Sequence, residues 1–306
     1  MRVLIIGAGN VAQRILPFLT PRCQVYAVLR DAGRIAWWRT HGAIPVLADL
    51  DQKRSCRRLD GLLRTVDCVI HLAPPAETTG RDAAGDPRMR RLLAFRAARR
   101  GAGILTQRWV YISTTGVYGD LGGDWADETA RCCPKTLRGQ RRLDAERRLR
   151  AGGATASRRV AILRVPGIYA ADRLPLARLQ AGTPVLAAED DVFTNHIHAD
   201  DLARVVLAAL RHGRANRIYH AVDDSPLPMA DYFDAVADAF ALPRPRRVSR
   251  EVAAAEISPA MLSYLAESRR LRNTRLKKEL RVRLRYPTVV DGLRAASPVV
   301  DPVWSD

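Results

Sequence analysis

The chain has 306 residues, of which 47% are hydrophobic, so it can bury a sizeable core as one large domain or two interlocked ones. Its formal net charge is +18, but only four of the 50 basic residues are lysine, and the arginines are spread over nearly every predicted helix. This scatter favours solvated helix faces over a nucleic-acid groove, although the dense run at 269–285 could bind an acidic partner.

Short apolar runs alternate with helical patterns through the first two thirds of the chain. The sequence predicts strands at 3–6, 24–29, 45–47, 66–72, 108–113 and 159–165, and helices at 11–19, 35–40, 51–59, 89–100 and 138–150. Near-continuous apolar strands separated by helices are typical of a parallel sheet covered on both faces. We therefore expect a doubly wound α/β fold of the Rossmann type.

After residue 165 the regular alternation loosens, because prolines interrupt the chain repeatedly. A helix at 200–210 and a strand at 217–222 still resemble sheet-domain elements. We expect a dinucleotide-binding domain formed by 1–166 and about 196–222. The segments at about 167–195 and 223–306 would form a smaller substrate lobe.

The motif GAGNVA follows the first predicted strand and matches the pattern G-x-G-x-x-A. Gly7 permits a tight strand-to-helix turn, Gly9 lets a pyrophosphate approach the backbone, and Ala12 keeps the helix close to the sheet. The N-terminus of the helix supplies free N–H donors to an anion. The sequence predicts nucleotide binding here.

The end of the second predicted strand reads AVLRD, where the adenosine ribose is expected. Arg30 would pair with a 2′-phosphate or stack on adenine, which favours NADP, whereas Asp31 leaves NAD open. Asp49 and Leu50 follow the third strand and would border the adenine ring.

The motifs LADLD, VDCVIHLAPP, YISTTGVYGD, LRVPGIYAADR and NHIHADDLA occur in this order. With them the chain resembles the extended and atypical short-chain dehydrogenase/reductase superfamily, particularly its NAD-dependent epimerase/dehydratase-like members. The resemblance covers almost the whole length. It implies that Asn10 and Val11 help Gly7 and Gly9 to hold the pyrophosphate. It further implies that cofactor contacts come from Ala73, Pro74, Pro166 and Ile168.

The same resemblance locates the reaction centre after the fifth strand and on the following helix. The superfamily has a Ser or Thr and a Tyr-x-x-x-Lys there; here Thr114 matches the hydroxyl, and Ser113 beside it is expected to contact the cofactor. In the stretch TLRGQRRLDAE, Arg138 stands at the tyrosine position and Arg142 at the lysine position. An arginine stays protonated and cannot be a general base, although Arg142 could still hold cofactor. Tyr118 is a candidate replacement acid.

Two histidines and two aspartates near residue 200 are expected to be structural. His196 and His198 point to one face of a predicted strand without a third ligand, so we expect no metal. Asp200 and Asp201 resemble a helix N-cap and a first-turn acid. The five cysteines are odd in number and lack CxxC spacing, so no zinc site or disulfide framework is expected.

Two functions are compatible with these residues. The first is an NAD(P)-dependent oxidoreductase or epimerase-like enzyme acting on a small substrate, with a nucleotide sugar as one class. The alternative is a non-catalytic NAD(P)-binding redox sensor or regulator. No leader precedes the first strand and no apolar run approaches ~20 residues, so we expect a cytoplasmic monomer or homodimer without membrane contact.

Overall fold

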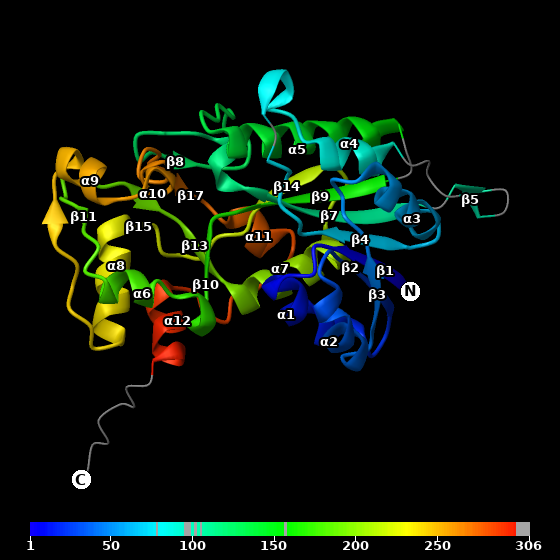
Figure 1. The fold of residues 1–306 in the computed structure, drawn as a ribbon, viewed down its shortest axis with the longest axis horizontal. Coiled ribbons are helices and arrows are strands. Elements are labelled where there is room, and N and C mark those ends of the chain that lie inside the picture. The colour runs from blue at the N-terminus through cyan, green and yellow to red at the C-terminus, as the bar shows by residue number, and fades with distance from the viewer. Residues whose placement is uncertain (78, 95–98, 101–102, 105, 156–157, 298–306) are drawn as a thin grey trace, which may run out of the picture.

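The computed structural model describes residues 1–77, 79–94, 99–100, 103–104, 106–155 and 158–297. Its centre is a seven-stranded sheet in which all neighbouring strands are parallel (Figure 1). The strands, in spatial order, are β14 (Arg217–His220), β9 (Arg158–Val165), β7 (Gln107–Thr114), β4 (Cys68–His71), β1 (Arg2–Ile6), β2 (Gln24–Leu29) and β3 (Ala43–Leu47). The predicted doubly wound α/β fold is confirmed.

Helices cover both faces of this sheet (Figure 1). Alternate side chains of a strand point to opposite faces, so Val3 and Ile5 of β1 join one core while Leu4 and Ile6 join another. The first core is closed by α1 (Asn10–Leu19), α2 (Ile35–Thr40) and α7 (Ala199–His212). The second is closed by α3 (Lys53–Leu63), α4 (Pro87–Leu93) and α5 (Leu137–Thr155).

The arginine-rich helix predicted at 89–100 is shorter in the structure. Helix α4 ends at Leu93, and Arg99–Arg100 is a strand, β5, paired antiparallel with β6 (Gly103–Ile104). Residues 95–98 lie outside the described part. Met89 and Leu92 are buried whereas Ala94 is exposed, so the packing that stabilises the helix ends there.

The remaining elements form smaller clusters beside the sheet (Figure 1). Four short strand pairs connect them: β10 (Gly167–Tyr169) with β13 (His196–His198), β11 (Val185–Leu186) with β16 (Arg247–Val248), β12 (Phe193–Thr194) with β15 (Leu227–Pro228), and β17 (Arg270–Leu271) with β8 (Trp125–Ala126). The helices are α6 (Leu176–Gln180), α8 (Met229–Ala239), α9 (Arg250–Glu256), α10 (Pro259–Leu262), α11 (Thr274–Lys278) and α12 (Val289–Ala296). The division into two domains stays a prediction.

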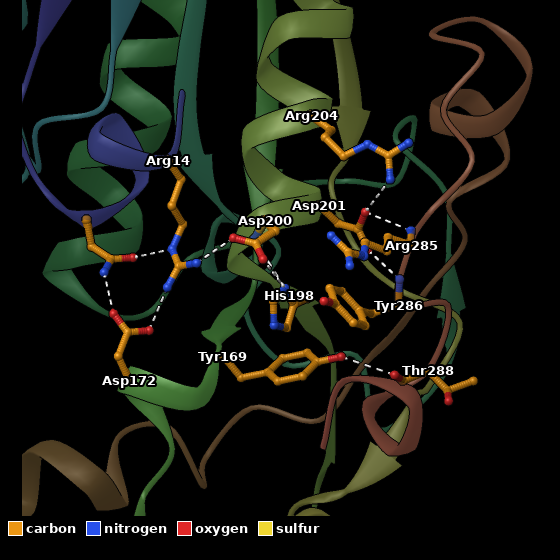
Figure 2. Close-up of polar contacts among 11 residues, drawn as sticks. Arg14, Tyr169, Asp172, His198, Asp200, Asp201, Arg204, Arg285, Tyr286 and Thr288 are labelled. Carbon is orange, nitrogen blue, oxygen red and sulfur yellow. Dashed lines mark hydrogen bonds and ion pairs between the residues drawn. The ribbon is translucent and has the colours of Figure 1, made fainter. Parts of the chain in front are cut away.

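The start of α7 fastens the C-terminal part of the chain (Figure 2). The N-cap is His198, whose side chain accepts a bond from the backbone N–H of Asp200, so the predicted aspartate cap is wrong by two residues. The carboxylate of Asp201 is fully buried and accepts the backbone N–H groups of Arg285 and Tyr286 at 2.8 and 2.7 Å. Asp201 is therefore structural, as expected.

Candidate functional site

The carboxyl ends of all seven strands lie along one edge of the sheet, because the strands run in one direction. The predicted residues that follow these ends are Gly7, Gly9, Asn10 and Val11 after β1, Arg30 after β2, Asp49 and Leu50 after β3, Ala73 and Pro74 after β4, Ser113 and Thr114 at the end of β7, and Pro166 and Ile168 after β9. The structure thus brings them to one edge, and Arg142 reaches it from α5.

The corner between β1 and α1 requires a glycine at position 7. Gly7 has a φ of +101°, and a Cβ there would stand 2.5 Å from the backbone nitrogen of Ala73. Gly9 is the N-cap of α1, whose first turn has neither a side-chain cap nor an acidic residue. The first N–H groups of the helix therefore remain for an anion. A cavity of about 330 Å³ lies here, lined by Gly7, Gly9, Asn10 and Val11.

The side chain of Asn10 is already bonded to protein groups. Its amide nitrogen donates to Asp172 at 2.7 Å, and its oxygen accepts from Nε of Arg14 at 3.0 Å. Arg14 also pairs with Asp172 at 2.6 Å and with Asp200. The backbone N–H of Asn10, in the first turn of α1, has no partner within the helix and is left for a cofactor. The next residue after Asp172, Arg173, lines the cavity at Gly7 and Gly9 and was missed in the sequence, because it lies 164 positions after Gly9.

A second cavity of about 350 Å³ lies where the adenosine is expected. It is lined by predicted residues Gly7, Gly9, Arg30, Leu50, Ala73 and Pro74, and also by Arg34 and Arg88. Asp31 lines it too, but its carboxylate accepts the backbone N–H of Gly33 at 2.8 Å. Asp49 does not line this cavity; its carboxylate accepts from the backbone of Asp51 and from Gln52.

Arg88 lines this second cavity and forms hydrogen bonds to two of the loops beside it. It donates through Nε to Asp51 at 2.8 Å and through Nη1 to the carbonyl oxygen of Pro74 at 2.8 Å. The guanidinium of Arg88 lowers the pKa of Asp51 mainly through its hydrogen bond to the carboxylate of that residue. One arginine thereby joins the loops after β3 and β4. No sequence signal distinguished Arg88 from the neighbouring surface arginines.

A third cavity of about 380 Å³ lies beyond the ends of β7 and β9. The predicted residues that line it are Pro74, Ser113, Thr114, Arg142, Pro166 and Ile168. Thr114 is half-buried, and its Oγ1 accepts the backbone N–H of Gly116 at 3.2 Å. This bond leaves the hydroxyl proton of Thr114 available to a bound oxygen atom.

The hydroxyl group of Ser113 is bonded to a buried ion pair and does not point freely into the cavity. Its Oγ donates to Oε1 of Glu146 at 2.5 Å. The other carboxylate oxygen of Glu146 pairs with Nη2 of Arg164 at 2.7 Å, and the two side chains are only 2% and 3% exposed. This cluster joins α5 to β7 and β9, and it fixes the strand end that carries Thr114.

The structure does not bring Tyr118 to the third cavity. Its side chain is fully buried, and its hydroxyl bonds to His220 Nε2 at 2.5 Å and to the carbonyl oxygen of Asp127 at 3.2 Å. Burial raises the pKa of Tyr118. A phenol in this environment holds a loop in place and has no path to a substrate.

Arg138 and Arg142 lie one turn apart on α5 and both line the third cavity. Nη1 of Arg142 donates to the carbonyl oxygen of Ile112 at 2.6 Å, and it also reaches Ala73 O at 3.3 Å. The guanidinium of Arg138 lies 4.0 Å above the centroid of the Tyr264 ring. Arg142 therefore borders the cofactor edge, whereas Arg138 faces the far wall.

The far wall of the third cavity is formed in part by residues near the C-terminus, Glu267 and Arg269, which the sequence analysis missed. Glu267 is buried, and its Oε2 pairs with Nη1 of Arg269 at 2.8 Å. His196 also lines the cavity; its Nε2 lies 3.1 Å from Oγ1 of Thr194, and burial lowers the pKa of His196 to about 3. Glu267 and Arg269 are distant in sequence from the predicted site and carry no motif, whereas His196 lies in the motif NHIHADDLA and was expected to be structural.

Neither a metal-binding cluster nor a membrane-spanning helix is found among the described residues. No three His, Cys, Asp or Glu side chains there gather closely enough to hold a metal ion. No helix in that part of the chain combines the length and apolar character needed to cross a bilayer.

Comparison with known proteins gives a consistent result. The model of the family described as RmlD substrate binding domain matches residues 1–286. A functionally unknown conserved protein from Silicibacter pomeroyi is 28% identical, with a TM-score of 0.77 over 96% of this chain and 97% of that one. UDP-glucuronic acid 4-epimerase from Bacillus cereus, in complex with NAD, is 16% identical, with a TM-score of 0.74 over 96% and 97%.

A third structure is a double mutant of DesIV (dTDP-glucose 4,6-dehydratase) from Streptomyces venezuelae with NAD bound. It is 20% identical to this chain, with a TM-score of 0.74 over 97% of this chain and 95% of that one. No curated protein matches the sequence significantly. The resemblance expected from the motifs, to NAD-dependent epimerases and dehydratases, is confirmed at the level of family and fold. The chain belongs to the RmlD substrate-binding-domain family.

Proposed function

We propose that this protein is an NAD(P)-dependent enzyme of oxidoreductase or epimerase type that acts on a small substrate. The observation that carries the proposal is the row of three cavities along the sheet edge, all of which share Pro74 as a lining residue. The row leads from Arg30, past the glycine corner, to Thr114, as an extended dinucleotide requires. Nucleotide sugars are the first substrates to test, since the named epimerase and dehydratase act on them.

NADP is the preferred cofactor in this proposal. Arg30 and Arg34 both line the adenosine cavity, and cationic side chains there suit a 2′-phosphate. Asp31 competes less well for a ribose hydroxyl because one of its oxygens caps Gly33. NAD remains the alternative, since the named structures contain it.

A nicotinamide held at this edge would supply hydride transfer, and the protein would position the substrate oxygen. Thr114 would donate its hydroxyl proton to that oxygen. Arg138, which takes the position of the family tyrosine, can donate hydrogen bonds but cannot accept a proton. Tyr118 is not retained as the acid because it is buried away from the cavity. When a carbonyl group is reduced, the proton that the substrate oxygen takes up would come from water or from another group of the substrate.

The test begins with fluorescence titration of NADPH and NADH. Arg30→Gln should weaken NADPH binding about tenfold and change NADH binding little, whereas Arg39→Gln, on the exposed side of α2, should change neither. Nicotinamide absorbance is then followed with nucleotide sugars and small carbonyl compounds. Thr114→Ala should reduce kcat about 100-fold, while the exposed Thr106→Ala should not.

A non-catalytic redox sensor is the second candidate, and Arg138 is the observation that favours it. Tight cofactor binding without turnover on any substrate would support the sensor, and lack of affinity for both dinucleotides would contradict both candidates. We propose a cytoplasmic location. Size-exclusion chromatography with light scattering will decide between monomer and homodimer.

A further inference from the structure

The third cavity has an excess of positive charge in its lining. Three arginines line it, Arg138, Arg142 and Arg269, against one acidic residue, Glu267. Glu267 is already paired with Arg269 at 2.8 Å. The guanidinium groups of Arg138 and Arg142 thus remain without a carboxylate among the lining residues, and an arginine cannot lose its charge.

Arg138 is the less compensated of the two. Arg142 bonds to backbone carbonyl oxygens, and it also acts electrostatically on the buried carboxylate of Asp86. Within the described residues, the Arg138 guanidinium contacts the Tyr264 ring, and its N–H groups have no protein acceptor.

The position of Arg138 on α5 is a second, independent observation. It lies in the first turn, where the helix dipole makes a cation unfavourable. This turn contains no acidic residue to offset the charge. The helix itself therefore does not stabilise the positive charge of Arg138. An anion bound next to the guanidinium would do so.

The other walls of the cavity strengthen any charge interaction inside it. Val165, Ile168, Phe193 and Met229 contribute apolar surface, which lowers the local dielectric constant. His196 adds no positive charge near neutral pH because burial holds its pKa near 3. A neutral substrate would leave the excess charge uncompensated.

We propose that the substrate carries an oxyanion group, a carboxylate or a phosphate, close to its reacting carbon, and that Arg138 binds this group. The inference rests on the proposed function, because it places the reacting carbon beside Thr114. The diphosphate of the cofactor does not meet this requirement, since its site is the separate cavity at Gly7 and Gly9.

The test is calorimetric titration of inorganic phosphate and of malonate into NADPH-loaded protein. Saturable binding is expected for at least one of them, and the stronger of the two identifies the group. Arg138→Gln should weaken binding at least about tenfold, as expected for a lost charge-assisted hydrogen bond. Arg138→Lys should restore part of the affinity, and Arg147→Gln, exposed on the same helix, should leave it unchanged.

Two results would overturn the inference: no saturable binding of either anion to the wild type, or equal affinity in Arg138→Gln. Cofactor affinity is measured for every variant beforehand. If the wild type binds no dinucleotide, the proposed function fails, and the anion titration is then read on the cofactor-free protein with the same two criteria. Circular dichroism of Arg138→Gln confirms that the variant is folded.

Discussion

Two glycines in the corner between β1 and α1 make different demands on the backbone. Gly7→Ala places a methyl group 2.5 Å from the Ala73 nitrogen at a φ of +101°, so we expect a loss of at least about 1–3 kcal/mol in the free energy of unfolding. Gly9→Ala meets no atom within 4 Å at a permitted φ of −96°, so stability should change by less than about 0.5 kcal/mol.

The two variants separate folding from binding, because the new methyl group of Gly9→Ala stands where the diphosphate is proposed. Urea denaturation measures stability, and fluorescence titration measures NADPH affinity. Gly9→Ala should bind NADPH at least about tenfold more weakly while remaining as stable as the wild type. Wild-type affinity in Gly9→Ala would contradict the placement of the diphosphate.

At the scale of elements, the ion pair between Glu146 and Arg164 joins α5 to the sheet. Removing one partner leaves a buried charge without compensation, so Glu146→Leu or Arg164→Met should each lower the free energy of unfolding by about 3–5 kcal/mol. The double variant should be less destabilised than the sum of the single ones, because it buries no charge. A double-mutant cycle by urea denaturation measures this coupling.

An additive cycle would mean that the two charges act independently, contrary to the 2.7 Å contact. The surface pair Arg64 and Asp60 provides the matched control. These side chains also lie 2.7 Å apart, but they are 51% and 31% exposed, so their coupling should be below about 1 kcal/mol.

The central elements could be predicted because local pattern and tertiary packing agree there. Strand Gln24–Leu29 and helix Ile35–Thr40 have the predicted boundaries, and each joins the buried core that its apolar residues suggest. The helix predicted at 89–100 is present but was predicted too long, because alanine and arginine favour a helix whether or not it can pack. The short strand pairs, such as β10 with β13, depend on partners distant in sequence and could not be predicted.

At the scale of the whole molecule, site residues that follow regular strands could be predicted, whereas those on other segments could not. Gly7, Arg30 and Ala73 follow strands that the sequence identifies, so their meeting at one edge could be inferred from a parallel sheet. Glu267 reaches its cavity from an irregular segment and Arg173 from a single 3-10 turn, Ala171–Arg173, and neither segment has a periodicity that fixes the direction of the side chain. Tyr118 was suggested by proximity in sequence to Thr114, but the loop turns its side chain into the interior.

Stability should fall as the pH drops below about 6.5, the ordinary pKa of histidine. Burial lowers the pKa of His71 and His196 to about 3 and that of His220 to about 4. Between these values and 6.5 the unfolded chain binds protons that the folded protein does not, so acid favours unfolding. Each histidine contributes up to about 1.4 kcal/mol per pH unit.

Urea denaturation at pH 7, 5.5 and 4.5 measures this dependence. His71→Phe removes a titrating group whose ring nitrogens have no hydrogen-bond partner in the described structure, so the stability of this variant should depend less steeply on pH. His212→Gln, at an exposed position, should retain the wild-type slope. Equal slopes for the wild type and His71→Phe would show that the pKa of His71 is the same in the folded and unfolded protein.

Arginine fastens the loops beside the proposed cofactor, since Arg88 and Arg142 donate to the backbone carbonyl oxygens of Pro74 and Ala73. A guanidinium keeps its proton far into the alkaline range, whereas a lysine ammonium group begins to neutralise near pH 10. These tethers should therefore survive alkaline buffers in which lysine substitutes would release the loops.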